Sequence, residues 1–348
     1  MRSIYSLSLD ELTTDMVKLG QNPYRAKQIY SWIYKKDVSS FDDMSDISKP
    51  FRNELKKLYD FSLPKMTDVQ VSKDGTIKCL MSLDDGQHVE SVLMHYVYGY
   101  SVCISTEVGC SMGCKFCASG LIAVKRKLQA NEMLGQVMAF NKYLFDLNKG
   151  KISHVVLMGT GEPFDNYENV LSFIKTINSP YGLEIGARHI TVSTCGIVPR
   201  IYDFSNEHLQ VNLALSLHAP NNELRNQIMP INKRYPLEEI IPAIIEFQKE
   251  TGRVVTYEYI MIKDFNDSLE LAKQLVLLCK KTNSYVNLIP YNKVVENGLS
   301  RSDNSQINKF HKFLLSHHVK STIRKEFGSD INAACGQLRV KKDKKNNS

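Results

Sequence analysis

Hydrophobic and polar positions along the chain change their period twice. In the first sixty residues apolar side chains recur every three or four positions, as in 26–33, which predicts short amphipathic helices. The run Ser-Leu-Asp-Glu at 8–11 is a capping box that predicts the start of a helix. Ser48 is placed to cap a further helix. The chain is therefore expected to begin with a small helical region.

Alternation with a period of two follows, and it predicts a β-meander. Apolar side chains alternate with polar ones on either side of two turn signals, Asp-Gly at 74–75 and Asp-Gly at 85–86. The last of these strands contains Val89, Glu90 and Val92. We expect residues 1–95 to form an accessory domain of helices and meander, with its own small core.

From about residue 100 apolar strand-like runs alternate with amphipathic helical stretches. Strands are predicted at 102–106, 152–158, 189–194, 211–217, 254–261 and 285–290, with a final one near 319–323. Such alternation predicts an α/β fold with a parallel sheet and right-handed crossovers. Six units are too few for a closed eightfold barrel, so we expect a partial, open (β/α)6 barrel over residues 96–340. Residues 341–348 form a basic tail, either solvated or in contact with nucleic-acid phosphate.

Composition narrows the class of protein. The sequence contains no run of 18 apolar residues, so no membrane span is predicted. The first residues lack the apolar region of a signal peptide. The 348 residues include eight clustered cysteines, which in such a chain indicate metal binding or catalysis in a reducing cytoplasm. The net charge of +7 is compatible with a polyanionic partner without requiring one.

Three cysteines carry the first clear chemical signal. Cys110, Cys114 and Cys117 form a C-x3-C-x2-C motif, with an aromatic residue before the last cysteine. Three thiolates can hold three irons of a cubane 4Fe-4S cluster, which normally takes four, and the fourth iron is then open to a ligand. A zinc site is the alternative, although no second C-x2-C or H-x3-H pair follows. The motif resembles that of the radical S-adenosylmethionine (SAM) superfamily.

Small polar groups follow the predicted strands, where loops of a β/α barrel build an active site. They are Gly161 and Glu162 after the second strand, Ser193 in the third, Ser216 and His218 in and after the fourth, and Asn292 after the sixth. Taken singly, the glycine loop is an ordinary turn, the serines are strand ends and the histidine is a satisfied buried side chain. Together they predict a rim that binds a polar cofactor.

The order of motifs resembles one family over about residues 4–340. After the cysteine loop come Gly-Glu-Pro-Phe-Asp-Asn, Ala-Arg-His-Ile-Thr-Val-Ser-Thr, Ser-Leu-His-Ala-Pro-Asn, Met-Pro-Ile-Asn, Val-Asn-Leu-Ile-Pro and Asp-Ile-Asn-Ala-Ala-Cys-Gly-Gln-Leu. These resemble the RlmN/Cfr family of radical SAM RNA methyltransferases. The resemblance implies a 4Fe-4S cluster on the three cysteines and two SAM molecules per turnover. The implied SAM contacts are Gly161, Glu162, Ser193, Ser216, Leu217, His218 and Asn292.

The resemblance also implies a mechanism that uses two further cysteines. Cys335 takes a methyl group from one SAM, and the radical derived from a second SAM abstracts hydrogen from that methyl. The carbon radical adds to adenine, and Cys103 then attacks the sulfur of Cys335, so that a transient disulfide releases the product. The bridged Cα atoms must lie roughly 4.4–6.8 Å apart. Glu90 matches the general base, whereas by itself it would be an ordinary solvated strand carboxylate.

Details of the motifs favour one branch of this family. Pro163 is typical of enzymes that methylate carbon 2 of adenine, whereas the resistance-type branch that methylates carbon 8 has alanine there. Two departures are Thr160, where a larger apolar residue is usual, and Cys195, where serine is usual. Beyond these two activities, a non-catalytic iron–sulfur or zinc RNA-binding protein stays an alternative.

The resemblance extends to partners and location. It implies 23S rRNA and the adenosine 3′ of the anticodon in some tRNAs as substrates, and a reductase such as flavodoxin or ferredoxin as electron donor. We expect a cytoplasmic monomer without a membrane partner. Basic residues of the helical region are expected to contact RNA backbone, with an ordinary amphipathic surface as the alternative; they are Arg25, Lys27, Lys35, Lys36, Arg52, Lys56 and Lys57.

Overall fold

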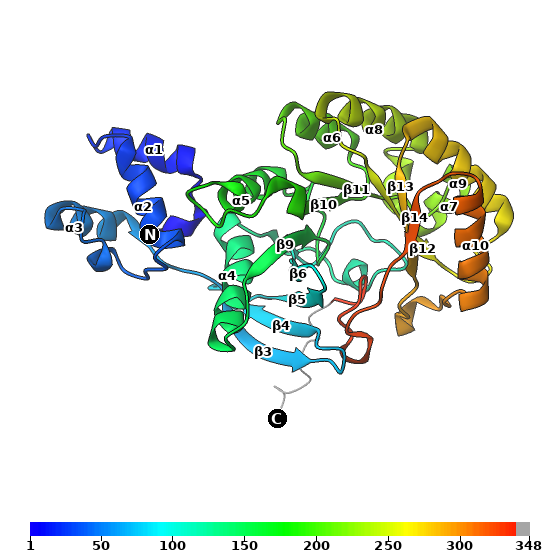
Figure 1. Ribbon diagram of the computed structural model, residues 1–348, viewed down its shortest axis with the longest axis horizontal. Coiled ribbons are helices and arrows are strands. Elements are labelled where there is room, and N and C mark those ends of the chain that lie inside the picture. Colours follow the sequence, from blue (N-terminus) through cyan, green and yellow to red (C-terminus); the bar gives the residue numbers. More distant parts are fainter. Residues whose placement is uncertain (339–348) are drawn as a thin grey trace.

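An open sheet of ten strands lies at the centre of the computed structural model, which describes residues 1–338 (Figure 1). Seven neighbouring strands are parallel and follow one another in sequence order. They are β6 (Gly99–Cys103), β9 (Ile152–Leu157), β10 (Ile190–Thr194), β11 (Asn212–Ser216), β12 (Thr256–Met261), β13 (Tyr285–Pro290) and β14 (Ser321–Ile323). The predicted strands are thus confirmed, although the first one begins and ends three residues early.

Helices cross over between consecutive parallel strands and cover the outside of the curved sheet (Figure 1). They are α4 (Ala130–Asp146), α5 (Tyr167–Asn178), α6 (Val198–Asn206), α7 (Asn222–Ile228), α8 (Leu237–Thr251), α9 (Leu269–Thr282) and α10 (Asn304–Ser316). The order confirms six β/α units, and β14 and β3 stand at opposite edges of the sheet, so the barrel is open as predicted.

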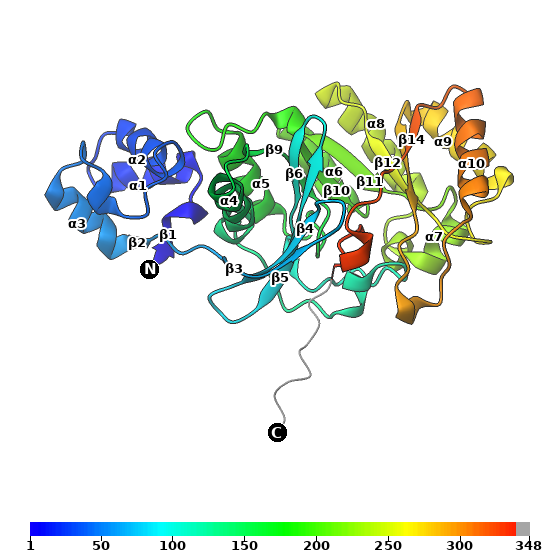
Figure 2. The same ribbon diagram turned by 60° about the horizontal axis from the view of Figure 1, so that its bottom comes forward.

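The meander is confirmed, but the expectation that it has its own core is wrong. Its strands β3 (Lys65–Val71), β4 (Ile77–Ser82) and β5 (His88–Tyr96) are antiparallel, and β5 pairs with β6. The meander therefore extends the central sheet (Figure 2). One buried hydrophobic cluster reaches from the N-terminal helices through the meander to the barrel. The alternation of apolar and polar residues showed which face of the meander is buried, but not that this face shares one hydrophobic cluster with the barrel. The division at residues 95 and 96 stays a prediction.

The N-terminal helices are α1 (Leu9–Lys18), α2 (Tyr24–Tyr34) and α3 (Lys49–Leu58). Both hydrogen bonds of the predicted capping box form at the start of α1. Ser48 stands at the N-cap of α3, without a side-chain capping bond to the described residues. A short parallel pair, β1 (Arg2–Ser3) with β2 (Tyr59–Asp60), closes this region.

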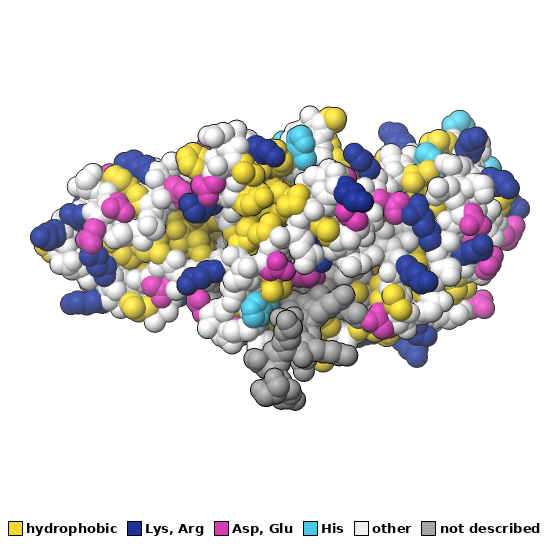
Figure 3. Space-filling view, turned by 90° about the horizontal axis from the view of Figure 1, so that it is seen from below, with side chains coloured by type: hydrophobic (Ala, Val, Ile, Leu, Met, Phe, Trp, Pro, Cys, Tyr) yellow, Lys and Arg dark blue, Asp and Glu magenta, His cyan; other side chains and the backbone are white. Residues whose placement is uncertain are grey.

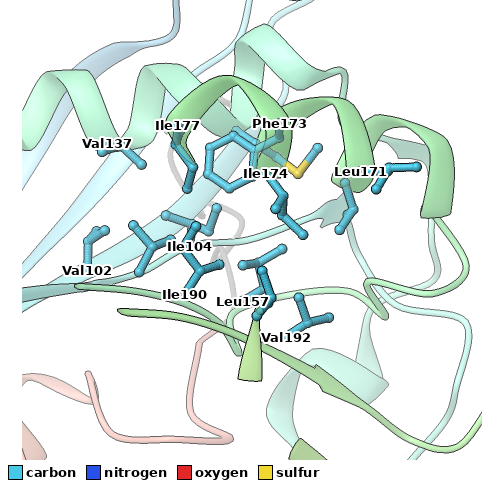
Figure 4. Packing of buried hydrophobic residues seen from close by; sticks show 14 of the residues in the cluster. Val102, Ile104, Val137, Leu157, Leu171, Phe173, Ile174, Ile177, Ile190 and Val192 are labelled. Atoms are coloured by element: carbon cyan, nitrogen blue, oxygen red, sulfur yellow. The ribbon is translucent and has the colours of Figure 1, made fainter. Parts of the chain in front are cut away.

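Buried aliphatic and aromatic side chains fix α5 on the outer face of the barrel strands. Phe173, Ile174 and Ile177 point from α5 toward the sheet (Figure 4). They meet Leu157 of β9 and Ile190 of β10, and all five side chains are fully or almost fully buried. Burial of each such side chain stabilises the fold by roughly 1.5–3 kcal/mol. The strand ends above this layer are therefore held on a rigid base.

The remaining elements are short. An antiparallel ribbon of β7 (Glu107–Val108) and β8 (Arg126–Lys127) brackets the cysteine loop. Single 3-10 turns occur at Ile4–Ser6, Phe41–Asp43, Ala118–Leu121, Ala187–His189, Pro230–Lys233, Val295–Asn297 and Ser329–Ile331. Among residues 1–338, none of the helices combines the length and apolar character needed to cross a membrane. The predicted basic tail at 341–348 lies outside the described residues.

Candidate active site

A cavity opens at the carboxyl ends of the parallel strands. The cysteine loop after β6 forms one wall, and loops after the neighbouring strands form the others. Nine of the predicted site residues line it: Cys110, Cys114, Cys117, Gly161, Glu162, Ser193, Ser216, His218 and Cys335. The prediction that the loops after the parallel strands lie around one cavity is thus confirmed, whereas the roles of the individual residues stay predictions.

Backbone hydrogen bonds fold the cysteine loop into a fixed shape. The N–H of Cys110 donates to the carbonyl of Ile122 at 3.0 Å, and that of Lys115 donates to Ile228 at 2.9 Å. A Cβ on Gly109, whose φ is +83°, would lie 2.3 Å from the carbonyl oxygen of Ala123. Only glycine therefore fits at the entry of the loop.

The three thiols suit a cluster better than a single ion. Burial raises the pKa of Cys110 to about 12 and that of Cys114 further, so bare thiolates are unfavourable there. Iron cations would offset this cost, because a coordinated thiol is deprotonated. A cubane cluster offers each of three thiolates its own iron, whereas a structural zinc site takes four ligands on one ion.

Gly161 and Glu162 are held by an acidic residue that the sequence reasoning missed. A Cβ on Gly161 would lie 2.7 Å from the Cβ of Glu107, and the N–H of Glu162 donates to Glu107 Oε2 at 3.0 Å. The Glu162 carboxylate accepts from the N–H groups of Cys195 at 2.8 Å and Phe164 at 3.0 Å. Burial raises the pKa of Glu162 and also raises that of Glu107, to about 8. Glu162 therefore brings a buried carboxyl to the cavity wall, and Glu107 supports it from behind.

His218 is a neutral, fixed side chain. Its Nδ1 accepts a hydrogen bond from the N–H of Ile260 at 3.2 Å, and its ring packs edge-on against Phe116. Burial lowers its pKa to about 3. Nearby, the hydroxyls of Ser193 and Ser216 lie 3.4 Å apart, with both oxygens at the cavity wall. These groups can donate to or accept from a polar ligand without carrying charge.

Leu217 is placed differently from the other predicted SAM contacts. Its side chain is fully buried and does not line the cavity. Its carbonyl accepts from Nε of Arg225, a fully buried residue whose Nη2 also donates to the carbonyls of Cys195 and Ser216. Burial lowers the pKa of Arg225 to about 10. This guanidinium, absent from the sequence prediction, ties the ends of β10 and β11 together.

A second pocket brings the predicted thiol pair together. Cys103 and Cys335 both line it, and Cys335 also lines the central cavity. Both thiols are free, and burial raises the pKa of each, that of Cys103 to about 12. Asn292 lines this pocket, and its Nδ2 donates to the carbonyl of Cys335 at 3.2 Å. The distance between the Cα atoms of Cys103 and Cys335 in a disulfide-bridged state stays a prediction.

Two aspartates place the segment that carries Cys335, and neither was singled out for this role. Asp74 accepts from the N–H of Gly328 at 3.0 Å, and Asp330 accepts from the N–H of Lys73 at 3.2 Å. At its other end, Gly336 accepts from the N–H of Ala118 at 2.7 Å. The segment is thus pinned between the first meander turn and the cysteine loop (Figure 2).

Glu90 is not in the central cavity. It lies on β5, only 8 % exposed, and lines a third pocket. Lys78 Nζ is 3.4 Å from its Oε1. The same pocket is lined by Asn332 and Gln337, which flank Cys335 in the sequence, and by Ala118 beside the cysteine loop. The alternative interpretation of Glu90 as an ordinary solvated carboxylate is therefore wrong.

The structure also places the remaining cysteines and Thr160, which with Cys195 differs from the residues usual in the family. Cys79 and Cys279 are buried. Cys195 lines the cavity, and its thiol donates to the sulfur of Met112 at 3.5 Å. Thr160 is buried, and its carbonyl accepts from the N–H of Thr106 at 2.9 Å. Thr160 thus joins the loop that contains Gly161 to the segment that follows β6.

Comparison with known proteins decides the family. The sequence model for the ribosomal RNA large subunit methyltransferase N-terminal domain matches residues 3–61, and that for the radical SAM superfamily matches residues 104–275. A probable dual-specificity RNA methyltransferase RlmN of Spiroplasma citri is 51% identical over 343 residues, with 99% of each chain covered. The chain belongs to the RlmN family of radical SAM RNA methyltransferases. A second probable dual-specificity RNA methyltransferase RlmN, from Geobacillus kaustophilus, is 50% identical over 342 residues, which cover 98% of this chain and 93% of that one.

A solved structure agrees with this assignment. The crystal structure of a radical SAM methyltransferase from Sphaerobacter thermophilus superposes with a TM-score of 0.90 at 40% identity, covering 97% of this chain and 99% of that one. The predicted fold class is thereby confirmed for nearly the whole chain. Membership of the radical SAM superfamily implies a 4Fe-4S cluster and SAM as cofactors.

Proposed function

We propose that the chain methylates carbon 2 of an adenosine in 23S rRNA and of the adenosine 3′ of the anticodon in some tRNAs. The observation that carries the proposal is the position of Cys335, which lines both the cavity at the cysteine loop and the pocket of Cys103. A thiol in this position can meet a SAM methyl on one side and a second thiol on the other. The relatives named dual-specificity RNA methyltransferases support RNA as the substrate.

Cys110, Cys114 and Cys117 are the residues that would hold the cluster. Gly161, Glu162, Ser193, Ser216, Leu217, His218 and Asn292 are the proposed SAM-binding set. With both cofactors bound, the cluster would supply the one electron that splits SAM into methionine and a 5′-deoxyadenosyl radical, and it would take one electron back from the RNA adduct. Within the cavity, Gly161 lets the backbone approach the ligand, and Glu162 offers a carboxylate to an ammonium group.

Cys335 carries the methyl group. Its sulfur loses a proton and forms a bond to the methyl carbon of a first SAM, whose sulfonium bond to that carbon breaks. The S-methyl group then gives up one hydrogen atom to the 5′-deoxyadenosyl radical, and the resulting carbon radical bonds to the adenine ring. Cys335 is at that stage joined to RNA through a methylene bridge. Asn292, which donates to the Cys335 carbonyl at 3.2 Å, orients this residue.

Glu90 and Cys103 complete the transfer. Glu90 takes the proton from the substituted ring carbon, as a positioned carboxylate can. Cys103, as a thiolate, attacks the sulfur of Cys335, so the S–S bond forms while the sulfur–methylene bond breaks. The bond's electron pair stays with the methylene carbon, which gains a proton and becomes the product methyl. A cellular reductant then opens the disulfide for the next cycle.

Contacts to RNA are proposed for the N-terminal helices. Lys and Arg side chains are spread along the length of the face seen in Figure 3, which suits contacts to phosphates rather than to bases. Two of the predicted basic residues form ion pairs within the described residues, because Lys56 pairs with Asp42 at 2.6 Å and Lys35 pairs with Glu184. Such exposed pairs are weak, so phosphate can compete for the lysines.

Two cysteine variants test the proposal. With the anaerobically reconstituted protein, Cys335→Ala should lose methyl transfer and keep its cluster absorbance. Cys103→Ala should leave RNA covalently attached to Cys335, visible as a shifted band on a denaturing gel. Cys279→Ala, a buried cysteine on α9 away from both pockets, serves as the matched control and should behave as wild type.

Three results would contradict the proposal. They are free methylated RNA at the wild-type rate from Cys103→Ala, 8-methyladenosine as the sole product, and absence of 5′-deoxyadenosine from the reduced wild-type protein. The second would assign the chain to the carbon-8 branch. The third would favour an RNA-binding protein without catalysis.

A further inference from the structure

Arg324 lies where the two cavities of the proposed reaction meet. It follows β14 directly, and its backbone N–H donates to the carbonyl of Leu288 at 2.8 Å. Its side chain lines both the central cavity and the pocket of Cys103 and Cys335. A charged side chain in this wall is unusual, because Met158 and Ile289 form the rest of the wall that the two pockets share with Cys335.

Buried contacts hold the guanidinium in place. Its Nη1 is 3.7 Å from Oε2 of Glu258 and 3.6 Å from the sulfur of Met158. Asn287 in turn donates to Glu258 Oε2 at 2.9 Å. A buried ion pair of this kind is weak evidence for stability, since removal of two charges from water costs about as much as their attraction returns. A role in the chemistry of the site is therefore the better explanation.

The thiols need a nearby positive charge. Burial raises the pKa of Cys103, the charge of a Cys335 thiolate raises it further, and Arg324 lowers it. Other ionisable groups around Arg324 and the thiols are Tyr96 of β5 and Glu258 of β12. At the rim of the pocket, Lys325 stands over the ring of Phe327 and Glu326 pairs with Arg301 at 2.6 Å. Arg324 is thus the cation held between the two cavities.

We propose that Arg324 is a positioning residue for product release, which offsets the negative charge of Cys103 while that thiolate attacks the sulfur of Cys335. This rests on the function proposed above. The Cys103 proton leaves to solvent, the S–S bond forms, and the electron pair of the sulfur–methylene bond goes to the RNA carbon, which is then protonated. No external oxidant is required, because the two electrons lost when the two sulfurs form the disulfide are taken up by the methylene carbon, which is reduced to a methyl group.

Single-turnover reactions with Arg324→Gln and Arg324→Lys test the proposal. Without the guanidinium the Cys103 thiol is harder to ionise, so Arg324→Gln should accumulate the covalent RNA adduct at about pH 7. Raising the pH should release it, by about ten-fold per pH unit while the thiol pKa stays above the pH. Arg324→Lys should release more product than Arg324→Gln. Lys325→Gln removes a neighbouring charge and should release RNA as wild type does.

The outcomes separate this inference from the proposed function. Cys103→Ala should trap the adduct at every pH, and if it traps none, the proposed function fails first. If Cys103→Ala traps RNA while Arg324→Gln gives free product with the wild-type pH profile, the role of Arg324 is wrong. It is equally wrong if Arg324→Gln keeps cluster absorbance and far-ultraviolet circular dichroism but forms neither adduct nor product, because Arg324 would then act before release.

Discussion

Replacement of Gly161 by alanine should damage the fold and the cofactor pocket together. The backbone at Gly161 has φ +107°, which L side chains rarely adopt. A Cβ there would lie 2.7 Å from Cβ and Cγ of Glu107 and 2.8 Å from its backbone nitrogen. Because the backbone contact cannot be relieved by rotation of a side chain, the glycine loop or β7 must shift.

The structure allows the two costs to be separated. Gly252, the C-cap of α8, also has positive φ, at +66°, but among the described residues nothing lies within 4 Å of its Cβ position. Gly252→Ala should lower the free energy of unfolding by about 1 kcal/mol, the backbone cost alone. Gly161→Ala adds an overpacking cost of about 1–3 kcal/mol, so its total should be roughly 2–4 kcal/mol.

Urea unfolding of the cofactor-free protein measures both variants, and calorimetry of the reconstituted protein measures SAM binding. Gly161→Ala should bind SAM more weakly, since a shift of Glu107 disturbs its 3.0 Å bond to the N–H of Glu162. Gly252→Ala should bind SAM as wild type does. Equal losses of stability in the two variants, with SAM binding intact in both, would refute the reasoning about the close approach.

Three further changes follow from buried charged or titratable groups. His218 has a pKa of about 3 in the folded protein against an ordinary 6.5, so stability should fall as the pH drops below about 6.5; His218→Gln should remove roughly 2 kcal/mol of the loss seen in urea unfolding between pH 7 and pH 5. Arg225→Met should cost about 3–5 kcal/mol in the same assay because it breaks bonds to three buried carbonyls, whereas the exposed Arg200→Met should cost about 1 kcal/mol or less. Glu90→Gln should lower methylation by about 100-fold or more while 5′-deoxyadenosine still forms, and an unchanged methylation rate would remove Glu90 from the mechanism.

Much of the fold could be predicted because period and turn chemistry are local. The two Asp-Gly turns, the capping box at Ser8 and the strand–helix alternation each depend on a few neighbouring residues. The site followed from one topological rule, that loops after parallel strands share one edge. Glu162 and Ser216 were found in this way, and they meet Cys110 of the C-x3-C-x2-C motif at one cavity.

Long-range contacts could not be predicted in the same way. The segment of Cys335 is held by Asp74 and Asp330, and a single sequence gives no sign that these two aspartates serve one segment. Arg225 and Arg324 were missed because an isolated arginine usually lies at the surface. Here their partners are carbonyls and a carboxylate from distant strand ends, which only the folded chain brings together.

The central claim is that Cys335 carries a methyl group to carbon 2 of adenosine in RNA. Nucleoside mass spectrometry of 23S rRNA and tRNA, from cells with the gene intact, deleted, or restored as Cys335→Ala, tests it most directly. We expect 2-methyladenosine in both RNAs with the intact gene, and its loss in the deletion and in the Cys335→Ala strain. Unchanged 2-methyladenosine in the deletion, or its full restoration by Cys335→Ala, would show that the chain does not methylate these RNAs through Cys335.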